Sequence, residues 1–149
     1  MRVDGPTAPT PPSARLRSGY GRVLALVIGD LGAFVVFAAL GRETHQEATG
    51  LGPIGQTLWT ALPFALGWFL VAPWLGAFRR AGAERPLQML LRTEIAWLAA
   101  WPVALLLRWR FTADLHLPPL SFAIVALLAN AVILGGWRTA FAALTKRGK

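Results

Sequence analysis

The chain has 149 residues, which leaves room for one domain. Hydrophobic residues make up 55% of it and charged residues 15%, and a soluble domain this short could not bury so much apolar surface. The composition therefore favours a membrane protein, and the absence of cysteine excludes disulfides and thiolate chemistry.

Residues 1–20 form a polar N-terminal stretch in which four prolines lie between positions 6 and 12. Such a composition predicts a disordered or extended tail rather than a packed element. A cleaved signal peptide is not expected, because the leading polar region is long and an aspartate interrupts the first apolar segment.

Four apolar segments follow, at residues 21–40, 54–78, 87–107 and 119–137. Each is close to the roughly 20 residues that a helix needs to cross a bilayer. Helices are the open-chain structure that satisfies backbone groups in lipid, so an all-α bundle of four transmembrane helices is predicted. Pro63, Pro73 and Pro102 lie within these segments and are expected to kink them. Residues 139–149 are predicted to form a basic tail.

The basic residues are distributed unevenly among the connections. Twelve lie in the N-terminal tail, around the connection between the second and third segments, and at the C-terminus; Arg42, Arg108 and Arg110 lie on the other side. The positive-inside rule then places both termini in the cytoplasm, with the bundle in a bacterial cytoplasmic membrane. The net charge of +8 is thus an orientation signal, and no nucleic-acid partner is expected because no nucleic-acid-binding motif accompanies it.

Asp30 stands in the middle of the first apolar segment, LALVIGDLGAFVVFAAL at 24–40. A carboxylate there costs roughly 2.5–3.5 kcal/mol on insertion scales, so it is expected to face protein and to have a partner. Asp30 lies eight residues from Arg22, and Asn130 eight residues from Arg138. If both arginines mark the membrane boundary, the two polar side chains share a depth, and Trp68 lies only slightly deeper.

The third segment offers a competing partner for Asp30. It is long enough to cross the bilayer only if Arg92 and Glu94 enter the inner hydrocarbon region. Arg92 can then snorkel to the interface or reach toward Asp30. Three interpretations of Asp30 stay open: an ion pair with Arg92 that pins helices together, a protonated carboxyl that donates to Asn130, and a relay for protons or cations.

Small residues recur beside Asp30 on the first segment. Ala25, Gly29 and Ala33 are four residues apart, a pattern that lets helix backbones approach closely. This stripe predicts that the Asp30 region faces a helix interface.

The predicted outer loops carry further polar residues, with weaker signals. Glu43, His45, Glu47, Asp114 and His116 are types that bind metals, but their spacing matches no metal motif, so no metal site or cofactor is predicted. Arg42, His45 and Arg108 are expected to lie at the outer face. No arrangement of nucleophile, base and acid supports an enzyme.

The motifs resemble an uncharacterised prokaryotic membrane family, domain of unknown function 3054, over about residues 24–138. The residues that carry the resemblance are Gly29, Asp30, Phe37, Gly41, Arg42, His45, Pro63, Phe64, Gly67, Trp68, Ala72, Pro73, Gly76, Arg108, Phe122, Gly136, Trp137 and Arg138. The resemblance implies a four-helix integral membrane protein and supplies no activity.

Two functional hypotheses follow. The first is a small carrier or carrier component with Asp30 at its polar centre, which requires a homo-oligomer or a membrane partner. The second is a scaffold or accessory subunit in which Asp30, Arg92 and Asn130 only lock the packing. A dry, fully paired Asp30 favours the second hypothesis.

Overall fold

The structure, a computed structural model, describes residues 12–44, 52–79, 85–111 and 118–147. These residues form four α-helices: α1 (Pro12–Thr44), α2 (Gly52–Val71), α3 (Pro86–Phe111) and α4 (Leu120–Arg147). Each helix contains a stretch long and apolar enough to cross a membrane. The prediction of an all-α bundle of four transmembrane helices is confirmed, and the chain is a multi-pass membrane protein.

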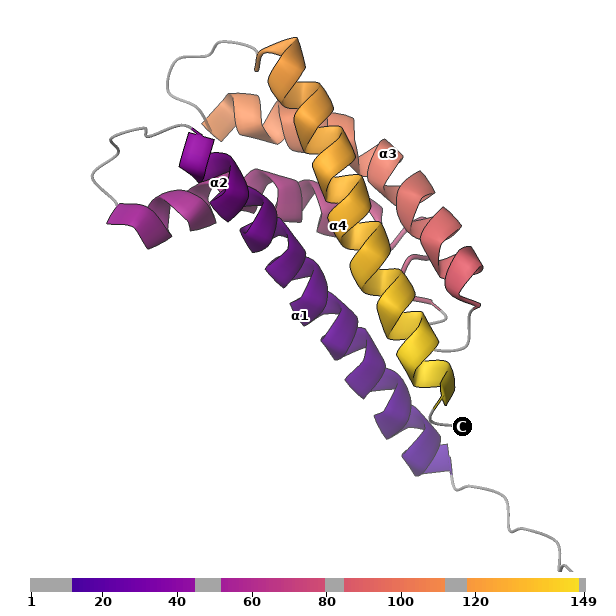
Figure 1. The fold of residues 1–149 in the computed structure, drawn as a ribbon. Helices are drawn as coiled ribbons and strands as arrows, with labels where there is room; N and C mark the ends of the chain where they lie inside the picture. Colours follow the sequence, from indigo (N-terminus) through magenta and orange to yellow (C-terminus); the bar gives the residue numbers. More distant parts are fainter. Residues whose placement is uncertain (1–11, 45–51, 80–84, 112–117, 148–149) are drawn as a thin grey trace, which may run out of the picture.

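The helices pack as a ring in which each touches its two neighbours. Helix α1 packs against α2 and α4, and α3 packs against the same two helices. The start of α1 and the end of α4 lie at one end of the molecule, whereas the end of α1 and the start of α4 lie at the other (Figure 1). The helical domain therefore begins and ends on the same side.

Large aromatic side chains fill the centre of the bundle. Phe34 of α1 lies 5.7 Å from Trp97 of α3, and Phe64 of α2 lies 6.2 Å from Phe122 of α4, measured between ring centroids. Between neighbouring helices, small residues also allow close contacts. A Cβ on Gly67 of α2 would lie 2.8 Å from the backbone of Ala104 of α3. This close approach holds the α2–α3 pair together.

The helix ends differ most from the predicted bounds at the start of α1 and the ends of α2 and α4. Helix α1 begins at Pro12, inside the predicted tail, because proline is well suited to the first helical position. Helix α4 continues ten residues past position 137, since Ala142 is buried with Leu26 and Met89 in a second apolar cluster. Helix α2 ends at Val71 and not at 78.

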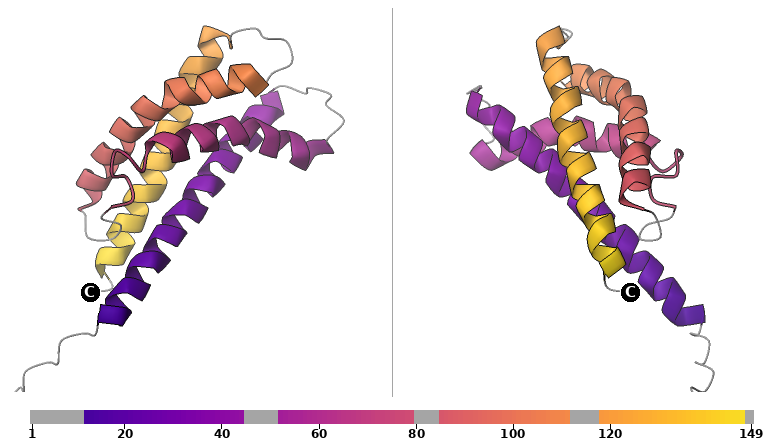
Figure 2. Two further views of the ribbon diagram at one scale, coloured as in Figure 1. Left: turned by 180° about the vertical axis from the view of Figure 1, so that it is seen from behind. Right: turned by 45° about the vertical axis from the view of Figure 1, so that its right-hand side comes forward.

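Two of the three prolines that were expected to kink helices lie inside a helix. Pro63 is within α2 and Pro102 within α3, and α3 is visibly curved in both views of Figure 2. Pro73 does not kink a helix, because it follows the end of α2. Pro73 is the second residue of a segment of turns that runs from Ala72 to Arg79.

Candidate functional site

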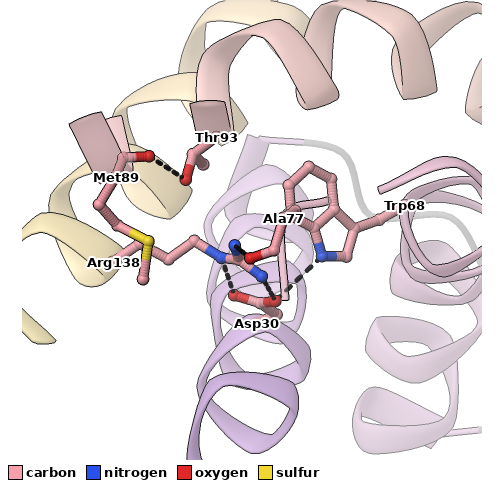
Figure 3. A network of polar contacts seen from close by, with 6 residues as sticks. All are labelled: Asp30, Trp68, Ala77, Met89, Thr93 and Arg138. Atoms are coloured by element: carbon pink, nitrogen blue, oxygen red, sulfur yellow. Dashed lines mark hydrogen bonds and ion pairs between the residues drawn. The ribbon is translucent and has the colours of Figure 1, made fainter. Parts of the chain in front are cut away.

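The polar centre of the bundle is an ion pair between Asp30 of α1 and Arg138 of α4. Arg138 Nε donates to Asp30 Oδ1 at 2.9 Å, and Arg138 Nη2 donates to Oδ2 at 2.6 Å. Both side chains are 0% exposed. Figure 3 shows the guanidinium lying edge-on to the carboxylate, which is the two-pronged geometry that makes arginine–carboxylate pairs strong.

Trp68 of α2 completes the surroundings of the carboxylate. Its indole Nε1 donates to Asp30 Oδ2 at 3.0 Å, and the whole side chain is buried. Three N–H donors thus converge on two oxygens. An ionised carboxylate accepts all three, whereas a protonated one would turn a hydrogen toward one of them. The arrangement therefore fits the charged form of Asp30.

Arg138 is satisfied on its other sides as well. Its Nη1 donates to the backbone carbonyl of Ala77 at 2.9 Å. Its guanidinium carbon lies 4.9 Å from the ring centroid of Trp68 and 4.6 Å from that of Phe78. Hydrogen bonds occupy the edge of the guanidinium and aromatic rings lie near it, a setting in which a desolvated arginine is stabilised.

The acceptor carbonyl of Ala77 is available because the backbone there is not helical. After Val71 the chain makes successive turns, closed by bonds such as Gly76 N–H to Pro73 O at 3.1 Å and Ala77 N–H to Ala72 O at 3.0 Å. Gly76 has a φ of 73°, which favours glycine. Non-helical backbone inside a membrane protein persists where protein groups satisfy it, and Arg138 supplies the donor for Ala77.

The prediction that Asp30 pairs with Asn130 or Arg92 is wrong. Asn130 is buried, but its Nδ2 donates to Ala126 O at 2.9 Å, and within the described residues its Oδ1 has no hydrogen-bond partner. Arg92 Nη1 donates to Gly76 O at 3.4 Å. Among the described residues, the hydrogen bonds and the ion pair of Asp30 are made with Arg138 and Trp68.

The error has a clear physical origin. The depth of Asn130 was counted from Arg138 as a boundary residue, whereas Arg138 is fully buried at the level of Asp30. Asn130 therefore lies about 12 Å farther along α4, since eight helical residues rise 1.5 Å each. The sequence does hold a signal for this, because Arg138 is followed by TAFAAL before the basic end of the chain.

The remaining intramembrane residues lie at helix contacts. Glu94 of α3 lies against Gly135 of α4, where an added Cβ would collide with its carboxylate. Gly29 faces the indole of Trp137, and a Cβ at Gly29 would overlap that ring. Of the other residues of the predicted stripe, Ala33 is buried and Ala25 is half-buried.

The residues predicted for the outer face are only partly described. Arg108 is half-buried and its guanidinium carbon lies 4.6 Å from the ring centroid of Phe122. Only the backbone of Arg42 and Glu43, at the end of α1, is described. His45, Glu47, Asp114 and His116 lie outside the described residues.

The comparisons with known proteins identify a family and no activity. The chain matches the family described as protein of unknown function (DUF3054) over residues 27–141, a range that contains Asp30, Trp68 and Arg138. No curated protein and no solved structure matches the chain.

Proposed function

The chain belongs to the DUF3054 family, and we propose that it is a non-enzymatic scaffold or accessory subunit of a membrane complex. In this role Asp30, Trp68 and Arg138 pin the helices and transport nothing. The observation that carries the proposal is the Asp30–Arg138 pair, in which both side chains are completely buried and both carboxylate oxygens are occupied. The uneven distribution of the basic residues among the connections supports a bacterial cytoplasmic membrane as the location of the chain.

A relay group must exchange its proton or ion with water during each cycle. Asp30 would first have to release Arg138, and separating a buried ion pair by removing one partner costs about 3–5 kcal/mol. Release would also leave the Ala77 carbonyl without its donor. The network is therefore better suited to fixing one arrangement of the helices than to switching between two.

A carrier is the second candidate, and one observation favours it. The non-helical segment Ala72–Arg79 lies directly beside the ion pair, and broken helices next to polar groups build the substrate sites of many transporters. A single bundle of four helices would need a second copy or another membrane protein to enclose a path.

Water access to the ion pair separates the two candidates. The natural chain has no cysteine, so a single introduced thiol reports one position. Ala33→Cys places a thiol one helical turn from Asp30 at a buried position. Lys146→Cys is the control, since Lys146 is an exposed charged residue in the last turn of α4. Both variants are reconstituted in vesicles and treated with a water-soluble thiosulfonate, which reacts with ionised thiols. Proton flux through the same vesicles is compared with that of Asp30→Asn.

We expect Lys146→Cys to react and Ala33→Cys to react only after unfolding, because the surroundings of Asp30 are completely buried. We expect native chain and Asp30→Asn to pass protons no faster than vesicles without protein. Rapid labelling of Ala33→Cys in the folded chain, or a flux that Asp30→Asn abolishes without unfolding, would refute the scaffold and favour the carrier.

A further inference from the structure

Part of the Ala72–Arg79 segment lines an open pocket. It has a volume of about 600 Å³ and is lined by Trp74, Leu75, Gly76, Arg79 and Arg92. This volume falls within the range of small-molecule sites, about 300–1,000 Å³. Neither Asp30 nor Arg138 lines the pocket, so it has no part in the scaffold proposal.

Two arginines, one from the segment of turns and one from α3, converge on one turn in this pocket. The backbone N–H of Arg79 donates to Gly76 O at 3.1 Å, and Arg92 Nη1 donates to the same oxygen at 3.4 Å. A Cβ on Gly76 would lie 3.2 Å from Arg79 Cδ, so the stem of Arg79 folds over the glycine. The turn at Gly76 thus brings both guanidinium groups to the same wall.

The ion pair is bonded to the same segment and holds this wall in place. Arg138 binds the carbonyl of Ala77, the residue that follows Gly76, and its guanidinium lies near the ring of Phe78. These contacts of Arg138 fix the segment to the bundle, so the turn on which the two arginines converge has a defined position.

The chemistry of the lining matches a phosphate group at a membrane surface. Guanidinium groups recognise phosphate oxygens through pairs of parallel N–H donors. Trp74 is 87% exposed, and exposed tryptophans concentrate at the level of lipid headgroups. Arg92 lies on α3 less than two turns from its start at Pro86, near the end of the bundle where α1 begins and α4 ends (Figure 2). Basic pockets between transmembrane helices bind anionic headgroups.

We propose that this pocket binds the phosphate of an anionic phospholipid headgroup. The test uses the purified full-length chain in detergent, titrated with phosphatidylglycerol or phosphatidylcholine and followed by native mass spectrometry. The variants are Arg79→Gln, Arg92→Gln and the two combined. Arg85→Gln is the matched control, because Arg85 is an exposed arginine directly before α3 that does not line the pocket.

We expect the native chain to prefer phosphatidylglycerol on the order of tenfold, since each arginine near an anionic headgroup adds roughly 1 kcal/mol. The double variant should lose this preference, and Arg85→Gln should keep it. Thermal unfolding of each variant shows whether it is folded. If Arg92→Gln unfolds, Arg79→Gln and the charge-conserving Arg92→Lys decide the matter, and we expect a several-fold loss in the first and a smaller loss in the second.

Results of three kinds, on the native chain, on the variants and on a competing ion, would overturn the proposal. The first is an equal affinity of the native chain for the two lipids. The second is an undiminished preference in the folded double variant, or an equal loss in Arg85→Gln. The third is displacement of phosphatidylglycerol by inorganic phosphate at the same concentration, which would assign the pocket to a free anion instead of a lipid.

Discussion

At the scale of single residues, Arg138 shows how a guanidinium can be buried in an apolar bundle. Desolvating an arginine and an aspartate is expensive, and their attraction offsets the cost only when the geometry is good and the remaining donors are satisfied. Here two donors reach Asp30, a third reaches Ala77, and two aromatic rings lie near the guanidinium. Asp30 is at the centre of an apolar segment because Arg138 is beside it.

The pairing predicts strong coupling between substitutions at these two positions. Asp30→Asn leaves a buried cation and Arg138→Met leaves a buried anion, so each single variant should lose about 3–5 kcal/mol of unfolding free energy. The double variant removes both charges and should lose about 2–3 kcal/mol less than the sum of the single losses. Reversible unfolding in mixed detergent micelles measures the unfolding free energy of the native chain, of the two single variants and of the double variant.

The control for this cycle is Asp30→Asn combined with Arg92→Leu. Arg92 donates to Gly76, whereas the carboxylate of Asp30 accepts from Arg138 and Trp68, so this second change should recover no stability. Recovery by Arg92→Leu, or additive losses at Asp30 and Arg138, would show that the ion pair is not the partner relationship that stabilises the bundle.

At the scale of helices, small residues determine how closely the elements approach. Gly67 lies against the backbone of Ala104, and Gly29 lies against the indole of Trp137. Lipid is as apolar as the core, so association depends on close packing and polar contacts. The α2–α3 contact is the more demanding of the two, because a backbone cannot move aside as a side chain can.

Gly67→Ala is therefore expected to destabilise the bundle by about 1–3 kcal/mol, the usual range for overpacking. Gly32→Ala on α1 is the matched control, since an added Cβ at Gly32 meets nothing within 4 Å. Its effect should stay within about 0.5 kcal/mol, as for most surface substitutions. The unfolding assay described above compares them, and an equal loss in both variants would show that glycine flexibility, not space, controls the contact.

The four helices could be predicted from the sequence, but the side chains that face one another between them could not. Apolar length gave four spans, because lipid imposes that constraint on each segment separately. The end of α2 was missed, since the apolar run continues through Ala72–Phe78 and hydropathy does not distinguish a helix from a buried series of turns. The partner of Asp30 was missed for a related reason: Arg138 was assigned to the boundary by its charge, although apolar residues follow it.

At the scale of the whole molecule, the distribution of side chains fits a membrane environment. Large apolar residues such as Ile28, Leu98 and Val132 are more than half exposed on the outside of the bundle, where lipid would cover them. Arg138 is buried and no longer counts as an orientation signal, which leaves eleven basic residues on the predicted cytoplasmic side against three on the other. The asymmetry that orients the chain survives this correction.

The last prediction concerns that orientation. The helical domain begins and ends on one side (Figure 1), and the basic residues assign this side to the cytoplasm. A cysteine introduced at Thr145, in the last turn of α4, should therefore resist an impermeant maleimide in intact cells and react after the cells are permeabilised. Gln46→Cys, in the predicted outer connection after α1, should react in both conditions and controls for reagent quality. Labelling of Thr145→Cys in intact cells, with protection of Gln46→Cys, would reverse the orientation and move the Arg79–Arg92 pocket to the outer leaflet.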